Sequence, residues 1–144
     1  MKLICLILQS FLLVISGFNV AKAQMVDDTW LIEAEEFQCP DKWTVSEETG
    51  VSGSGILKVG YNANPNANAY TAITVTTAGT YSVWTRSRDY PDDRPGTRRF
   101  LMYVNEIAMS EESGKHGLEG YYWEKVGFTT LDTGEALLRI KDSR

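Results

Sequence analysis

One stretch of the sequence constrains the fold more than any other, because a turn led by Gly79 runs directly into side chains of alternating character up to Arg86. Successive side chains of a β-strand point to opposite faces of its sheet. The predicted strand therefore has two faces, which are Tyr81, Val83 and Thr85 on one side and Ser82, Trp84 and Arg86 on the other. Since a two-layer sandwich buries one face of each sheet, we expect Tyr81 and Val83 to lie in the core.

Shorter β-like runs flank this strand in both directions. Their ranges are 31–37, 56–59, 71–76, 98–105, 121–130 and 136–141. Short strands separated by turn residues are typical of an antiparallel all-β sandwich. Loop-like composition fills 40–55 and 86–99, so we expect long connections there, with Trp43 and Val45 the residues of the first loop that become buried.

The first 23 residues have the pattern of a secretory signal peptide. Lys2 precedes a largely apolar run from Leu3 to Ile15, and Ala21-Lys22-Ala23 forms a small-x-small cleavage site before Gln24. The apolar run is shorter than the about 20 residues that a membrane-spanning helix needs. We therefore predict a signal-peptide helix over 1–23, no membrane span, and a product that is secreted or periplasmic.

Cleavage would leave residues 24–144, which is one domain of ordinary size. Removal of Lys2 and Lys22 takes the 14 basic residues to 12, against 19 acidic ones. Nucleic acid is excluded as an expected partner, because phosphate binding needs a basic field that this chain lacks. The one cysteine that would remain is Cys39. It would be a buried apolar residue or the partner of a cysteine beyond the present C-terminus.

Two carboxylates, Glu33 and Glu35, alternate along the predicted first strand and would point to the same side. Like charges so placed repel unless a cation lies between them, so a bound Ca²⁺ is one interpretation. A solvated strand face is the other.

The densest aromatic cluster lies where a polar loop meets the strand predicted over 121–130. Tyr121 and Trp123 would share one face of that strand, and the only histidine, His116, lies in the preceding loop. Aromatic faces at such a junction suit sugar rings, although core packing is the alternative. A single histidine offers no second imidazole for zinc and no adjacent nucleophile.

Two arginines open the mixed-charge loop predicted after the central strand. Arg86 and Arg88 could bind acidic or hydroxylated ligands, or they could pair with the nearby aspartates. We include both with Trp123, Tyr121 and His116 as candidate ligand-binding residues.

Several motifs occur in an order typical of known modules. They are Glu33-Ala34-Glu35, Ser52-Gly53-Ser54-Gly55, the strand at 78–86, the turn Val104-Asn105-Glu106 and the stretch 131–140. Region 24–144 resembles jelly-roll carbohydrate-binding modules of families 6 and 35, within the galactose-binding-like β-sandwiches. It also resembles the N-terminal β-sandwich domains of exported Bacteroides-type FAD-dependent oxidoreductases and polysaccharide-acting enzymes. The spacing of Trp123, Gly127, Leu131 and Gly134 is similar to that of golvesin and xanthan-lyase binding domains.

The resemblance implies roles for particular residues. Glu33 and Glu35 would bind a structural Ca²⁺, and Tyr121 with Trp123 would form the sugar platform, while the late asparagine of the family has no counterpart. Modules of this kind continue into a final strand that pairs near the first one. Since the sequence stops at Arg144, we expect the sandwich to lack its last strand.

Three functions are consistent with these observations. The first is a non-catalytic module that binds glycans and holds an enzyme near its substrate. The second is a structural domain that packs on a catalytic domain of the same full-length protein, such as a FAD-dependent oxidoreductase or a glycan-degrading enzyme. The third is an enzyme in its own right, which we do not expect because no carboxylate pair stands out as catalytic.

Overall fold

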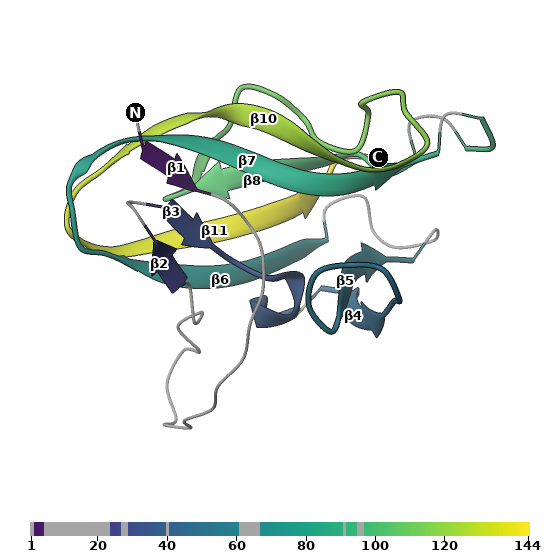
Figure 1. Ribbon diagram of the computed structural model, residues 1–144, viewed down its shortest axis with the longest axis horizontal. Helices are drawn as coiled ribbons and strands as arrows, with labels where there is room; N and C mark the ends of the chain where they lie inside the picture. The colour runs from purple at the N-terminus through teal and green to yellow at the C-terminus, as the bar shows by residue number, and fades with distance from the viewer. Residues whose placement is uncertain are drawn as a thin grey trace.

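The computed structural model describes residues 2–4, 24–26, 29–39, 41–60, 67–90, 92–94 and 97–144 (Figure 1). Its strands are β1 (Lys2–Ile4), β2 (Gln24–Val26), β3 (Thr29–Leu31), β4 (Trp43–Glu47), β5 (Gly55–Val59), β6 (Asn68–Val75), β7 (Gly79–Asp89), β8 (Phe100–Val104), β9 (Ile107–Ala108), β10 (Gly120–Leu131) and β11 (Gly134–Asp142). Within these ranges the one helical element is a 3-10 turn, η1 (Ala34–Glu36). The predicted all-β fold is confirmed.

The strands form two main sheets and one hairpin. Sheet A has the order β10-β7-β1-β3-β2, sheet B has the order β6-β11-β8-β9, and β4 pairs with β5. Figure 1 shows β7 and β10 in one layer and β6 and β11 in the other. Neighbouring strands are antiparallel except for β1, which runs parallel to both β3 and β7. The result is an antiparallel sandwich with a hairpin at one end.

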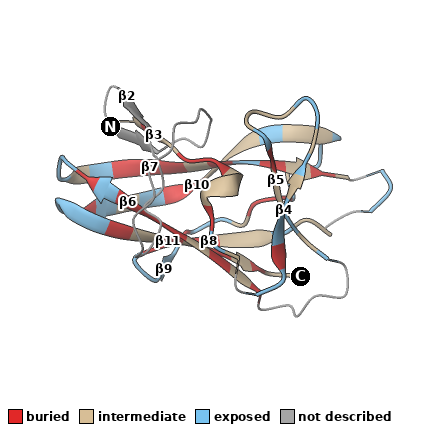
Figure 2. Ribbon diagram, turned by 90° about the horizontal axis from the view of Figure 1, so that it is seen from below, coloured by how far each residue is buried: buried red, intermediate tan, exposed pale blue. Residues whose placement is uncertain are grey.

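The core lies between the two sheets, as the alternation along β7 predicts. Tyr81 and Val83 are 0% and 1% exposed, which confirms their inward direction. The Tyr81 ring packs on Trp30 of β3 with 4.7 Å between ring centroids. Leu138 of β11, which is fully buried, closes the core from sheet B. In Figure 2 the buried stretches, drawn in red, recur along β6, β7 and β11.

The first predicted strand is shorter than the sequence suggests. β3 ends at Leu31, and the backbone N–H of Glu36 then donates to the carbonyl of Glu33 at 3.1 Å, which starts the 3-10 turn. The turn brings Phe37 to 5% exposure. Glu33 and Glu35 therefore do not alternate on one strand face, and that prediction is wrong.

The region 40–55 is not the long connection that we expected. Trp43–Glu47 forms β4, which pairs in register with β5 from Trp43↔Val59 to Glu47↔Gly55. Trp43 is buried and its indole N–H donates to the carbonyl of Ala67 at 2.9 Å, whereas Val45 is 44% exposed and was wrongly expected to be buried. Polar residues at the outward positions hid this strand in the sequence.

The chain's first residues also differ from the predicted helix. Lys2–Ile4 is extended and forms β1, because its backbone finds partners on both β3 and β7. The rest of the predicted signal peptide, apart from this strand, lies outside the described residues. No helix among the described residues is long and apolar enough to cross a membrane.

Candidate functional site

Four of the five predicted ligand-binding residues gather on one face of sheet A. Strands β7 and β10 place Arg88 opposite Tyr121, and Arg86 opposite Trp123. Residues directly opposite each other in an antiparallel pair point to the same side. Because the alternating neighbour Thr85 is buried in the core, all four point away from it. The outer face is defined by Trp84, Arg86, Arg88, Tyr121, Trp123 and Lys125.

Arg86 and Arg88 lie on β7, and not in the loop that the sequence predicted, because β7 continues to Asp89. Their guanidinium carbons are 5.5 Å and 5.4 Å from the centroid of the Tyr121 ring. Arg88 also lies 4.3 Å from the centroid of Tyr90. Cations near ring faces are attracted by the electrons of the ring. Both arginines are therefore close enough to the Tyr121 ring for this attraction.

One carboxylate from the β4–β5 hairpin fixes this arrangement. The phenol of Tyr121 donates to Oε1 of Glu48 at 2.8 Å, and Arg88 Nη1 donates to the same oxygen at 3.1 Å. Burial, followed by the hydrogen bond to Glu48 and its charge, raises the pKa of Tyr121 to about 12. The phenol is thus a neutral donor. Sequence reasoning missed Glu48, which is 73 positions away from Tyr121 and carries no local signal.

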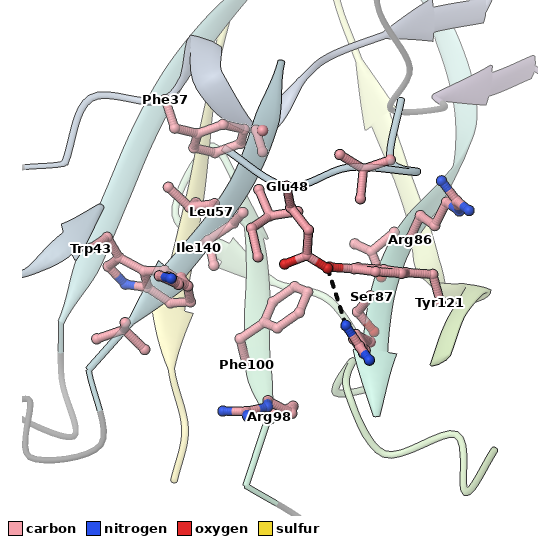
Figure 3. A pocket seen from close by; sticks show the side chains of 18 of the residues that line it. Phe37, Trp43, Glu48, Leu57, Arg86, Ser87, Arg98, Phe100, Tyr121 and Ile140 are labelled. Atoms are coloured by element: carbon pink, nitrogen blue, oxygen red, sulfur yellow. Dashed lines mark hydrogen bonds and ion pairs between the residues drawn. The ribbon is translucent and has the colours of Figure 1, made fainter. Parts of the chain in front are cut away.

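A cavity of about 360 Å³ opens beside the outer face, between the hairpin and the two sheets (Figure 3). Apolar side chains from the residue after η1, both hairpin strands and sheet B line it, namely Phe37, Trp43, Leu57, Phe100 and Ile140. Its rim is polar and includes Glu48, Arg86, Arg88, Arg98 and Tyr121. Trp123 is not among the lining residues, so it extends the outer face away from the cavity.

His116 does not join the outer face. Its ring lies 5.1 Å from the ring of Tyr122, which alternates to the side of β10 opposite Tyr121. Its Nδ1 accepts the N–H of Leu118 at 3.2 Å, so the proton is on Nε2, which donates to the carbonyl of Ser87 at 3.2 Å. The hydrogen bond from His116 to Ser87 therefore connects the loop before β10 to β7.

The two predicted Ca²⁺ ligands lie at the start of η1. Glu33 is 6% exposed, and its Oε1 has no hydrogen-bond partner among the described residues. Burial first, and then the charges of Glu35 and Glu36, raise the pKa of Glu33 to about 7, while Arg86 opposes this rise.

Glu35 contributes a second carboxylate oxygen without a partner among the described residues. Its Oε1 accepts both the N–H of Ser54 at 3.0 Å and the hydroxyl of Ser54 at 2.9 Å, which leaves Oε2 buried and unbonded. Carboxylate oxygens of this kind suit Ca²⁺, so Glu33 and Glu35 fit as two of its ligands. The described part of the chain contains no group of three His, Cys, Asp or Glu side chains that could hold a metal, so further oxygens would have to come from other groups.

Comparison with known proteins identifies the architecture. No protein-family model and no curated protein matches the sequence. The structure is similar to the GH26-CBM35 β-(1,4)-mannanase of Podospora anserina, with a TM-score of 0.56 and 18% identity over 74% of this chain and 24% of that chain. The fold is that of a family 35 carbohydrate-binding module.

Two isolated modules support this conclusion. A family 35 carbohydrate-binding module from an environmental isolate gives a TM-score of 0.55 at 15% identity, covering 72% of this chain and 73% of that one. The CBM35 of Cellvibrio japonicus Abf62 gives 0.53 at 17% identity, covering 73% and 76%. The present chain therefore spans about a quarter of the mannanase and about three quarters of each single module. At these identities the likeness concerns the fold.

Proposed function

We propose that the chain is a non-catalytic module that binds glycans on its outer face. The observation that carries this proposal is the partly exposed ring of Trp123 beside Arg86, Arg88 and Tyr121, on a sandwich with the fold of carbohydrate-binding modules. Apolar faces of sugar rings pack on aromatic rings. The guanidinium groups would donate hydrogen bonds to the hydroxyl groups at the edge of the same sugar.

The wider setting belongs to the same proposal. The module would be exported by the segment 1–23 and joined to a catalytic domain, as a CBM35 is joined to the mannanase of Podospora anserina. It would bring that domain to its substrate and would not itself carry out the reaction. A structural role on a FAD-dependent oxidoreductase or a glycan-degrading enzyme is the alternative, and it would leave the purified chain without affinity for glycans.

We further propose that Glu33 and Glu35 bind a structural Ca²⁺. The ion would give both unbonded oxygens a partner and relieve the repulsion between the two carboxylates. Addition of Ca²⁺ should raise the melting temperature of chelator-treated protein, whereas Mg²⁺ should have a smaller effect. An unchanged melting temperature would contradict the proposed Ca²⁺ site.

The purified chain should be tested on a glycan array, followed by titration of the glycans that bind. Loss of one platform ring removes about 1 kcal/mol or more, so Trp123→Ala should weaken binding about tenfold or further. The matched control is Tyr122→Ala, because Tyr122 is the adjacent aromatic residue of β10 and points to the opposite side, where it is 44% exposed. Equal affinity of both variants, or no glycan bound, would contradict the proposal and favour the structural role.

A further inference from the structure

Strand β10, which lies beside β7 in Figure 1, has one irregularity in its pairing. Its register shifts between Lys125 and Gly127, and Val126 is the extra residue of the resulting β-bulge. Val126 is 1% exposed and belongs to the core. A bulge re-aims the side chains that follow it. Each residue of β10 after Val126 therefore points to the side opposite to the one that simple alternation predicts.

The bulge turns Phe128 to the same side of sheet A as the outer face. Phe128 lies opposite Ser82, and the neighbours of Ser82 along β7, Tyr81 and Val83, point into the core. Residues directly opposite each other in an antiparallel pair point to the same side, so Phe128 points away from the core. It is 53% exposed. A single exposed aromatic ring is ordinary on a protein surface, so the residues around Phe128 decide what it can do.

Phe128 completes an aromatic row, which consists of Trp123, Trp84 and Phe128. These three residues occupy successive outward positions along the paired strands, at the levels of 86, 84 and 82 of β7. Trp84 and Trp123 are partly exposed. Each step between levels is two residues of an antiparallel strand, and diagonal neighbours on adjacent strands lie within reach of long side chains. The aromatic row therefore extends over two steps, or about 14 Å.

Cationic side chains accompany the aromatic row at two levels. Nζ of Lys125, which lies opposite Trp84, is 3.7 Å from the centroid of the Phe128 ring, where the electrons of the ring attract it. Arg86 lies opposite Trp123. Ammonium and guanidinium groups donate hydrogen bonds, and sugar hydroxyl groups can accept them. Successive sugar rings on the row would thus meet both an aromatic surface and a donor.

The aromatic row is longer than a single sugar. A sugar ring that packs on Trp123 covers about the width of one aromatic ring, whereas Phe128 is two levels away, at about 14 Å. One sugar ring cannot contact both side chains, and directly linked sugar rings lie closer together than this. A glycan that contacts both Trp123 and Phe128 therefore has at least one further sugar between them, at the level of Trp84.

We propose that the aromatic row binds an extended linear glycan of about three or more linked sugars, with Phe128 as a distal subsite that the bulge at Val126 positions. The chain lies along β10, because the row follows this strand. The inference rests on the proposed glycan binding at Trp123, and it adds the length of the glycan and the residue on which the dependence on length relies.

The test is calorimetric titration of the full chain with the disaccharide and the hexasaccharide of three extended β-1,4-linked series, which are mannobiose and mannohexaose, xylobiose and xylohexaose, and cellobiose and cellohexaose. In at least one series the hexasaccharide should bind about tenfold more tightly than the disaccharide, because it gains one more aromatic contact. Maltohexaose, whose α-1,4 links make it coil, should bind more weakly than the best extended hexasaccharide. Equal affinity of disaccharide and hexasaccharide in every series would overturn the distal subsite but leave the proposed glycan binding intact. Failure of all three extended hexasaccharides to bind, or tighter binding of maltohexaose, would overturn it as well.

A substitution assigns the dependence on length to Phe128. Phe128→Ala should weaken binding of the hexasaccharide about tenfold, so that the hexasaccharide loses its advantage over the disaccharide. The matched control is Ile107→Ala, because Ile107 is also a large apolar residue at the surface, 66% exposed, but lies on β9 of sheet B. This control should keep the advantage of the hexasaccharide. A hexasaccharide that binds the Phe128→Ala variant as tightly as the unaltered chain would overturn the proposal.

Discussion

The strands β11 and β7 invite comparison, since both have strong alternation and both cross the middle of the sandwich. β11 pairs with β6 on one edge and β8 on the other, so its backbone is used on both sides. β7 pairs fully on one edge and over three residues on the other. The alternation of a sequence thus specifies which face of a strand is buried, but it does not specify how many neighbours the strand has.

The buried carboxylates near these strands follow the same contrast. Asp142, at the end of β11, is 1% exposed and accepts two hydrogen bonds of 2.9 Å from the Arg144 guanidinium and one of 3.2 Å from the Arg144 backbone N–H. Glu33, between β3 and η1, is 6% exposed, and its Oε1 has no hydrogen bond to the described residues. The two buried carboxylates therefore differ in their surroundings, because Asp142 is paired with a guanidinium and the Oε1 of Glu33 is not.

The largest expected effect comes from a charge placed in the shared core. Val83→Asp and Leu138→Asp should each unfold the protein, because a buried unpaired carboxylate costs several kcal/mol, which is of the order of the whole stability of a small domain. The measurement is thermal unfolding followed by circular dichroism. Thr130→Asp is the control, since Thr130 is exposed at the end of β10. If only one of the core variants unfolded, the two sheets would not share one cooperative core.

The second expected effect compares the two carboxylates. Asp142→Asn should lower the free energy of unfolding by about 2 kcal/mol at pH 7, because the Arg144 guanidinium loses its charged acceptor. Glu33→Gln should have the opposite sign at this pH, because it removes a carboxylate whose charge is destabilised by burial. Urea titration of both variants in chelator-treated protein, where no Ca²⁺ pairs with Glu33, checks the signs. A loss of stability from Glu33→Gln under these conditions would contradict a destabilised charge on Glu33.

The pH dependence follows from the same group. The pKa of Glu33 is raised from 4.5 to about 7 in the folded chain, so the folded state holds a proton that the unfolded state releases. This contribution to stability is complete below pH 4.5 and is lost as the pH rises to about 7. Melting temperatures of chelator-treated protein should show the loss, and Glu33→Gln should lack it. A midpoint near 4.5 in the native protein would contradict the raised pKa.

The sequence predicted some parts of this molecule well, for identifiable physical reasons. Alternation on β7 predicted that Tyr81 and Val83 point inward, because the face to which a strand residue points depends only on its neighbours in the sequence. The 3-10 turn after Glu33 could not be predicted in the same way, because Glu-Ala-Glu is compatible with a strand. The turn is stabilised by its backbone hydrogen bonds and by the burial of Phe37. The prediction of two carboxylates on one strand face failed there.

The sequence identified four residues that share the outer face, but it did not show how the face is assembled, and their binding of a ligand stays a prediction. Arg86, Arg88, Tyr121 and Trp123 were identified by type, and the register of β7 with β10 brings them together. Glu48 was not identified, because its role depends on where a separate hairpin docks. Long-range contacts of this kind leave no periodic trace in a sequence.

The smallest expected effect tests the contact that Glu48 of the hairpin makes with Tyr121 and Arg88 of sheet A. Tyr121→Phe removes the hydrogen bond to Glu48 but leaves Arg88 bound to the same oxygen, so the free energy of unfolding should fall by about 1 kcal/mol or less. The phenol has its pKa raised to about 12, so its contribution is present below pH 10 and is lost as the pH rises through 12. Absorbance near 295 nm should show one late-titrating tyrosine that is missing from the variant. Tyr122→Phe, on the opposite side of β10, should change neither measurement, and a late titration that survives in Tyr121→Phe would show that the hairpin does not hold this phenol.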